Sequence, residues 1–408
     1  MRAIVCLNFV GSVPLFKGGR GIGFLNSHPS FSQSLMSRIA FVFLEILSCE
    51  GGIQSYVRDI LSALPAAMDD RPEDQTSADI FLLRDPATVE NPFASDRLQF
   101  HYFKSANANL GRLKLTAALI AYILKEKPTH LYCGHINLAT LIQPIAKFFA
   151  IPFTVLTYGK EVWEPLPIAK QKALQAASRV WTISRYSRDR LCESNHIDPS
   201  KVDFIYCAVD GQAFKPTSKD PNWVAKYGLA NSRVLMTVAR LWSGDRYKGV
   251  DVTIRALPEI AIQFPDVKYL VLGRGDDQPR LAQLAIDLGV SDRVIFAGFV
   301  ANEDLVAHYN LADAYVMPSQ EGFGIVYLEA MACGVPVLSG DADGSSDPLQ
   351  DGKLGWQVPH RDPDAVAMAV CEMLKGGVEK TDGEWLRSQC LAIFDKPAIA
   401  RSLSSLLK

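Results

Sequence analysis

The chain has 408 residues, 48% of them hydrophobic, which is enough to bury two ordinary domain cores. Its formal net charge of −2 gives no general basic surface, so the composition does not predict nucleic-acid binding. The eight cysteines are scattered without a C-x-x-C pair, which favours reduced thiols in a cytosolic protein over disulfides or zinc ligands. No apolar run approaches the roughly 18 residues of a transmembrane helix.

Residues 1–36 are predicted to be an extension outside the fold. The apolar stretch 3–10 follows Arg2 but is short, and no small-residue cleavage pattern comes after it. This arrangement does not favour a signal peptide. A clean strand pattern begins only in the segment 39–44.

From residue 37 on, apolar strands alternate with helical segments, a pattern typical of a parallel sheet covered by helices. The pair Gly51-Gly52 lies between the first strand, 39–47, and the first helix, where a phosphate or a sugar can approach the backbone. Any tight turn also suits two glycines, so both interpretations stay open. Further strands are expected at 78–84, 130–133, 153–157, 180–184 and 202–206.

Three polar side chains follow strands of this first half. His135 comes after 130–133, and Tyr158 and Glu161 come after 153–157. The carboxyl ends of strands in open α/β sheets face the ligand crevice, so all three residues are candidates for a binding site. An ordinary loop histidine with satisfied hydrogen bonds is an equally good interpretation of His135.

An amphipathic helix is predicted over 110–127, with Leu113, Ala117, Ile120 and Leu124 on one face and basic residues elsewhere. Helices of this kind usually present the charged face to solvent. They can also lie on a membrane surface, and both interpretations stay open.

The stretch 210–222 contains two prolines and little periodicity, which is typical of an interdomain linker. A second alternation follows, with strands expected at 234–239, 269–272, 294–298, 314–317 and 336–338. The fold class is therefore α/β with two Rossmann-like domains. We expect a first domain at 37–212, a second at 213–390, and a helix at 391–408 that packs back on the first.

The second half places cations and carboxylates at its strand ends. Arg240 and Lys248 suit a diphosphate, as do free amides at a helix start after the Gly-x-Gly turn 322–324. Glu321 and Glu329 bracket this turn, and two carboxylates without a metal-ligand cluster suit a ribose and a sugar. Taken alone, Glu329 is better explained by a salt bridge to a neighbour. Together these residues predict a sugar-nucleotide site.

The stretch from Glu321 to Val337, Glu-x7-Glu followed by Ala-Met-Ala-Cys-Gly-Val-Pro-Val, closely resembles the signature of retaining family 4 glycosyltransferases with the GT-B fold. The resemblance runs in order over about residues 37–400, through the segments 238–251, 271–275, 293–298, 313–319 and 343–355. It implies two Rossmann-like domains facing each other across a donor and acceptor cleft. It also implies a retaining hexosyltransferase in polysaccharide or glycoconjugate assembly, with a UDP-, GDP- or ADP-sugar donor and neither metal nor cofactor.

The resemblance further implies a role for each candidate residue. Glu329 would hold the ribose hydroxyls, and Glu321 would contact the transferred sugar. Arg240 and Lys248 would clamp the diphosphate and stabilise the leaving group. Backbone contacts are implied for Phe323, Gly324 and Ile325 with the sugar and diphosphate, for Gly52 with the donor phosphate or the acceptor, and for Gly273 and Gly275 with the base.

The chain departs from the family pattern at several positions. Tyr158 stands where many relatives have a histidine near the donor sugar, although Glu161 is kept, so the donor sugar can differ. Asp347 falls where a glutamate is commoner. Asp341 and Asp343 have the spacing of a metal-binding pair, but they lie on a loop where the family needs no metal.

Three alternatives to a glycosyltransferase remain: a non-hydrolysing sugar-nucleotide epimerase of the same fold, a nucleotide-binding oxidoreductase and a non-catalytic sugar-binding module. The oxidoreductase is disfavoured because the glycines at 273 and 275 lack the third glycine of the dinucleotide fingerprint. For the acceptor we expect a lipid-linked sugar, with loose contact between residues 105–127 and the cytoplasmic face of the membrane.

Overall fold

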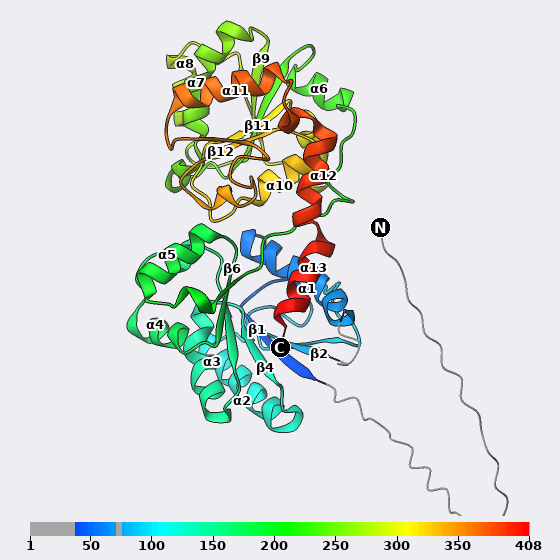
Figure 1. Cartoon of the computed structure of the whole chain (residues 1–408), viewed down its shortest axis with the longest axis vertical. Helices are drawn as coiled ribbons and strands as arrows, with labels where there is room; N and C mark the ends of the chain where they lie inside the picture. Colours follow the sequence, from blue (N-terminus) through cyan, green and yellow to red (C-terminus); the bar gives the residue numbers. More distant parts are fainter. Residues whose placement is uncertain (1–36, 71–75, 408) are drawn as a thin grey trace, which may run out of the picture. The chain divides into compact units, whose positions relative to one another are not determined.

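The computed structural model describes residues 37–70 and 76–407, and Figure 1 shows the arrangement of their helices and strands. The predicted extension at 1–36 lies outside the described residues. The described chain forms two parallel sheets, each flanked by helices, which confirms the predicted α/β class with two Rossmann-like domains.

The first sheet has seven strands in the order β3-β2-β1-β4-β5-β6-β7, all parallel. The strands are β1 (Arg38–Phe43), β2 (Ser77–Leu82), β3 (Leu98–Tyr102), β4 (His130–Cys133), β5 (Phe153–Leu156), β6 (Arg179–Thr182) and β7 (Val202–Phe204). Its helices are α1 (Gly52–Asp69), α2 (Ala108–Glu126), α3 (Ile136–Phe149), α4 (Ile168–Gln175) and α5 (Arg185–Asn195). The strand order reverses at β1, and open α/β sheets bind ligands at such a reversal.

The second sheet has six parallel strands in the order β10-β9-β8-β11-β12-β13. They are β8 (Arg233–Val238), β9 (Val267–Leu272), β10 (Val294–Gly298), β11 (Ala314–Met317), β12 (Val337–Gly340) and β13 (Trp356–Val358). The remaining helices are α6 (Pro221–Tyr227), α7 (Val250–Gln263), α8 (Gln278–Asp287), α9 (Asn302–Tyr309), α10 (Ile325–Ala332), α11 (Pro363–Lys375), α12 (Gly383–Phe394) and α13 (Lys396–Leu406), of which α13 packs on the first domain.

The central strand β1 is buried on both faces, as expected for a parallel sheet between helix layers. Phe41 and Phe43 join a cluster that includes Val57 of α1. Their neighbours on the strand point the other way, and Val42 packs in a separate cluster with Leu119 of α2. The side chains therefore alternate between two cores, which explains why this segment reads as a continuous apolar run.

Helices α12 and α13 end the described chain and meet at Asp395, which divides the helix that we expected over 391–408. The Asp395 carboxylate accepts a hydrogen bond of 2.9 Å from the Lys396 amide and caps α13. Helix α13 then lies along α1, as Figure 1 shows, and Leu403 is buried in the same cluster as Val57.

Three local expectations need correction. Strands β3 and β13 were not predicted, and β1 ends at Phe43 rather than at residue 47. In α2 most of the predicted apolar face is exposed: Leu113 and Leu124 are 66% and 63% exposed, whereas Ile120 packs partly against the core. A second apolar stripe is buried instead, comprising Leu115, Leu119, Tyr122 and Ile123.

Candidate active site

The carboxyl ends of strands from both sheets border a cavity of about 510 Å³, here called the central cavity. It is lined by Gly52, Ile53, Tyr56, Tyr158, Ile183, Cys207, Arg240, Tyr247, Lys248, Glu321, Gly322, Phe323, Gly324, Ile325 and Val326. A neighbouring cavity of about 610 Å³ shares the walls at Gly52, Arg240 and Lys248 and extends to Gly273 and Phe299. The structure thus brings together predicted residues that are far apart in sequence.

Glu321 and Lys248 form an ion pair on the wall of the central cavity. The backbone of Glu321 is held by the loop after β12, since its amide donates to Asp343 Oδ2 at 2.5 Å and its carbonyl accepts from the Gly344 amide at 2.8 Å. Lys248 is followed by Gly249, whose φ of +75° and contact with the Pro318 carbonyl leave no room for a side chain. Both charged groups therefore have fixed backbones.

Arg240 follows β8 and is anchored by Asp245, with Nε donating to Oδ2 at 2.6 Å. The Asp245 side chain is buried, whereas the Arg240 side chain is 68% exposed. The pair therefore fixes one edge of the guanidinium and leaves the rest of it accessible to a ligand in either cavity.

The turn 322–324 brings backbone amides to the start of α10. Gly324 has a φ of +92°, and a Cβ there would lie 2.4 Å from the Tyr327 ring. Only glycine fits this position, and the chain enters the helix with Gly324 and Ile325 on the cavity wall. A helix start oriented in this way favours an anionic group.

Glu329 lies one turn further along α10 and does not line the central cavity. Tyr309 donates a hydrogen bond of 2.6 Å from its hydroxyl to Glu329 Oε2. Burial raises the pKa of Glu329 to about 7, although the Tyr309 bond acts in the opposite direction. No cation among residues 37–70 and 76–407 forms an ion pair with it, so the salt-bridge interpretation receives no support.

Of the three polar candidates in the first domain, Tyr158 lines the central cavity, whereas Glu161 and His135 stabilise the local backbone. Tyr158 lines the central cavity, donates to the Gly134 carbonyl at 2.5 Å and meets the edge of the Tyr56 ring at 5.6 Å. The carboxylate of Glu161 accepts from the Tyr158 amide at 2.5 Å and stabilises the turn. Glu161 is outside the lining, and burial raises its pKa.

His135 also lies outside the central cavity, at the N-cap position that precedes α3. Its Nδ1 accepts from the Asn137 amide at 3.0 Å, which caps the helix. Burial lowers the pKa of His135 to about 4, and its ring is therefore neutral at pH 7. Gly51, with a φ of +157°, precedes the lining residue Gly52, while Gly275 borders a third cavity beside Trp242.

The prediction missed two residues beside the site, Lys160 and Tyr247. Lys160 Nζ lies 3.3 Å from the centre of the Tyr247 ring. Burial lowers the pKa of Lys160, while nearby Glu321 opposes that effect. Lys160 follows Gly159 at the end of β5, so the rule that strand ends carry ligand contacts could have identified it.

The acidic loop after β12 has a structural role. Asp343 accepts from the Ser345 amide at 2.8 Å as well as from Glu321, and burial raises its pKa to about 6. Asp347 is buried and pairs with Arg185 at the start of α5. Within the described ranges no three His, Cys, Asp or Glu side chains gather as a metal site would require, and no helix is long and apolar enough to cross a membrane.

The family model for glycosyl transferases group 1 matches residues 232–376. A GDP-mannose-dependent alpha-(1-6)-phosphatidylinositol monomannoside mannosyltransferase of Mycobacterium tuberculosis is 30% identical over 370 residues, covering 83% of this chain and 89% of that protein. The protein of the same name from Mycolicibacterium smegmatis is 37% identical over 235 residues, covering 53% of this chain and 59% of that relative.

Solved structures show the same fold. HepE from Anabaena, in complex with UDP, has a TM-score of 0.71 at 20% identity, covering 91% of this chain and 99% of that one. Sucrose-phosphate synthase from Thermosynechococcus elongatus has a TM-score of 0.69 at 22% identity, covering 91% and 98%. These matches confirm the GT-B architecture, and the relatives give no support to the epimerase alternative.

Proposed function

The chain belongs to the glycosyl transferases group 1 family, and we propose that it is a retaining hexosyltransferase that needs no metal ion. The observation that carries this proposal is the central cavity, which gathers Gly52, Arg240, Lys248, Glu321 and the start of α10 around one space. In this proposal the domain at 37–212 holds the acceptor and the domain at 213–390 holds the donor.

The donor diphosphate would lie between Arg240, Lys248 and the amides of Gly324 and Ile325. These groups supply two positive charges and the positive end of a helix. The backbones at Lys248 and Gly324 are fixed before a ligand arrives, and Asp245 anchors the Arg240 side chain. Once the diphosphate displaces Glu321 from Lys248, these groups would stabilise the charge that develops on the leaving group. The same groups would replace the divalent cation that other sugar-nucleotide enzymes use.

The two glutamates would recognise hydroxyl groups. Glu321 lies at the mouth of the α10 turn, where it can accept hydrogen bonds from the transferred sugar. Glu329 is deeper, and its Oε2 already accepts from Tyr309 while the second oxygen can accept from ribose. Gly273 and Phe299 in the neighbouring cavity would lie near the base.

Retention is supported by the acids that line the site. Among the described lining residues of the central cavity, Glu321 is the one acid, and it is paired with Lys248. We therefore assign no carboxylate nucleophile. The leaving diphosphate would take the proton from the acceptor hydroxyl, so the new bond forms on the face that the diphosphate leaves. Isolation of a covalent glycosyl-enzyme would contradict this mechanism.

The named relatives suggest the substrates. We propose GDP-mannose as the donor and a glycolipid built on phosphatidylinositol as the acceptor. The test is a thermal-shift series with GDP-mannose, UDP-glucose and ADP-glucose, followed by release of the nucleotide diphosphate in the presence of phosphatidylinositol-based acceptors. We expect GDP-mannose to raise Tm most. Stabilisation by none of the three donors would contradict the proposal.

We also propose peripheral contact with the cytoplasmic face of a membrane. Helix α2 exposes Leu110, Leu113 and Leu124, which are 45%, 66% and 63% exposed, beside the basic residues Arg112 and Lys114. Apolar side chains next to cations suit the boundary between headgroups and acyl chains of anionic lipids. A lipid-linked acceptor would then reach the first domain without leaving the bilayer.

A further inference from the structure

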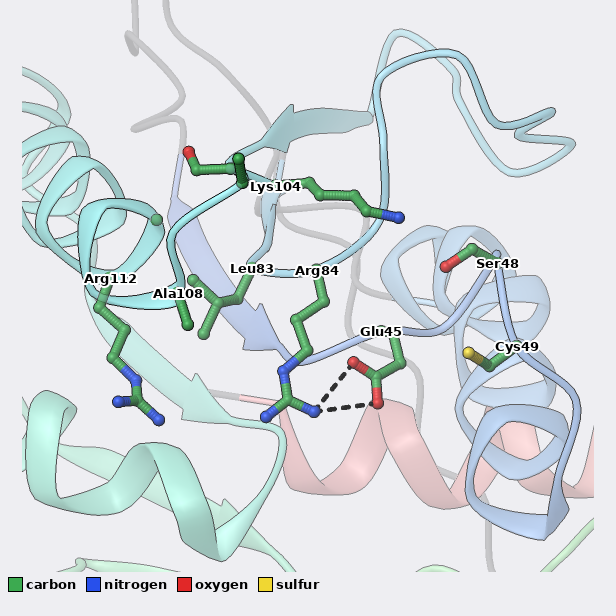
Figure 2. A pocket seen from close by; sticks show the side chains of 11 residues that line it. Glu45, Ser48, Cys49, Leu83, Arg84, Lys104, Ala108 and Arg112 are labelled. Atoms are coloured by element: carbon green, nitrogen blue, oxygen red, sulfur yellow. Dashed lines mark hydrogen bonds and ion pairs between the residues drawn. The ribbon is translucent and has the colours of Figure 1, made fainter.

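A second polar cavity, here called the basic cavity, lies entirely in the first domain and has a volume of about 410 Å³. Figure 2 shows its walls, formed by the segment after β1, the end of β2, the segment after β3 and the first turn of α2. Three cations from separate elements line it: Arg84 after β2, Lys104 after β3 and Arg112 on α2. Glu45 is the one acid among the described lining residues.

The β1–α1 segment that forms one wall is fixed from both sides. The buried carboxylate of Asp85 accepts from the amides of residues 46, 47 and 48 at 2.8, 3.1 and 2.7 Å. Arg58 of α1 donates to the carbonyls of residues 46, 47 and 49 at 2.8, 3.1 and 3.0 Å. Six hydrogen bonds therefore hold this short segment, and the wall has its shape before any ligand binds.

The three cations of the basic cavity differ in whether they have an acidic partner. Arg84 pairs with Glu45 at 3.1 Å, as the dashed lines in Figure 2 show. Neither Lys104 nor Arg112 forms an ion pair with a described residue; Arg112 reaches only Asn109 Oδ1 at 3.5 Å. The start of the 19-residue helix α2 adds positive potential. The cavity thus carries an excess of positive charge.

The basic cavity is next to the central cavity. Residues 45, 48 and 49 border the former and residues 52 and 53 border the latter, so one short segment separates them. On the other side, Arg84 is close enough to His135 to oppose protonation of its ring. The His135 ring lies 6.1 Å from the ring of Tyr158, which lines the central cavity. A molecule that fills both cavities would span only one loop.

We propose that the basic cavity binds a phosphate ester of the acceptor, with Lys104 and Arg112 as its ligands and Arg84 as a third cation that Glu45 partly neutralises. Arginine offers a planar pair of donors and lysine a mobile point charge, a combination that suits phosphate oxygens. The assignment rests on the proposed function, because it places the acceptor hydroxyl of the same molecule in the central cavity.

The experiment compares the wild-type chain with the K104Q/R112Q double variant, with K147Q, which changes an exposed lysine of α3 outside the cavity, as the control. Binding of inositol phosphate and of unphosphorylated inositol is measured by calorimetry at low salt. Co-sedimentation with phosphatidylcholine vesicles is measured with and without phosphatidylinositol. GDP binding is measured for every variant, because it tests independently of the basic cavity whether the donor site and the fold are intact.

We expect the wild type to bind inositol phosphate but not inositol. The affinity of K104Q/R112Q for inositol phosphate should fall at least about tenfold, whereas K147Q should bind it like the wild type, and GDP binding should be unchanged in both variants. E45Q should tighten phosphate binding several-fold, because it releases Arg84 and removes a competing carboxylate; a purely structural role for these residues would not predict that gain. If K104Q/R112Q loses binding only to vesicles that contain phosphatidylinositol, the ligand is a lipid phosphate. If it loses affinity for free inositol phosphate, the ligand is a soluble phosphate.

Equal phosphate binding by the wild type and K104Q/R112Q in both formats would overturn the inference. So would vesicle binding that depends on the exposed leucines of α2 and not on Lys104 and Arg112, since that result identifies a membrane surface instead. Failure of GDP and of every donor to bind would contradict the proposed function, and the separate GDP measurement distinguishes these two failures.

Discussion

Lys248 and Glu321 neutralise each other across the wall of the central cavity. A diphosphate that binds Lys248 must therefore compete with Glu321, and a sugar that binds Glu321 must compete with Lys248. When a diphosphate takes Lys248, the carboxylate becomes available to the sugar. The pair thus links recognition of the two ends of one donor molecule.

Replacing Glu321 with Gln tests this link. Lys248 would lose its competing carboxylate, so GDP should bind E321Q as well as or several-fold more tightly than wild type. Turnover should fall by about a hundredfold, because the transferred sugar loses a contact close to the reacting carbon. Calorimetry with GDP and steady-state release of GDP from GDP-mannose separate the two effects. E259Q, a change on the exposed surface of α7, serves as the control; weaker GDP binding by E321Q would refute the competition.

Protonation of Glu329 should weaken the donor site. Burial raises its pKa to about 7, so the carboxylate that we assign to the ribose hydroxyls is increasingly neutral below that pH. GDP affinity should fall between pH 8 and pH 6 in the wild type. E329Q should bind GDP more weakly than the wild type at pH 8. Its GDP affinity should also lose the pH dependence that comes from Glu329, so that only the titration of the nucleotide itself remains. If GDP affinity changed with pH in the same way in the wild type and in E329Q, the assignment of Glu329 to the ribose would be contradicted.

Glu329 should also cost stability at alkaline pH. Its folded-state pKa lies above the ordinary value of 4.5, so the folded chain holds the proton more tightly than the unfolded chain. The penalty is full above pH 7 and disappears as the pH falls toward 4.5. E329Q should therefore be more stable than wild type by about 1 to 2 kcal/mol at pH 8, with the difference shrinking by pH 5. Urea unfolding at the two pH values measures this change.

Asp347 should contribute more to stability than its neighbour Asp351. The side chain of Asp347 is 3% exposed, and it accepts from the Arg185 amide at 2.6 Å as well as pairing with the guanidinium. Asp351 also pairs with Arg185 but is 63% exposed. D347N should lower the free energy of unfolding by about 1 to 3 kcal/mol, and D351N by less than about 0.5 kcal/mol. Equal urea midpoints for the two variants would contradict this ranking.

The exposed leucines of α2 provide a test of membrane contact. L113S/L124S should reduce co-sedimentation with anionic vesicles several-fold while leaving GDP binding unchanged. The matched control is I262S, which removes another exposed aliphatic side chain, 72% exposed, on α7. If both variants lose vesicle binding equally, or if the wild type does not bind, the contact is excluded.

Apolar runs predicted most strands because each parallel strand is buried between helices on both faces. The prediction failed where this reason does not hold. Strand β3, Leu98–Tyr102, lies at the edge of its sheet and contains alternating polar residues, and β13 has only three residues. In α2, two apolar stripes compete for the core, and a helical period alone does not distinguish the packed stripe from the exposed one.

The candidate site was predictable where strand ends and glycine turns mark it. The sequence pointed to Arg240, Lys248 and Glu321, and the structure places all three on the central cavity. Pairings across long sequence distances were not accessible. Arg185 and Asp347 are 162 residues apart, and neither carries a local signal for the other. The hydrogen bonds from three backbone amides to Asp85 could not be predicted either, because the arrangement of those amides depends on the folded backbone.

The packing of α13 on α1 has a consequence for synthesis of the chain. Ile399 and Leu403 complete the buried cluster that also contains Ile60 and Leu64, which leave the ribosome far earlier. At about 5 to 20 residues per second, α1 waits roughly 20 seconds or longer for its partner. During that interval its apolar side is open to chaperones and to other nascent chains. A chain truncated before α13 should therefore aggregate, although every residue of the donor site is present.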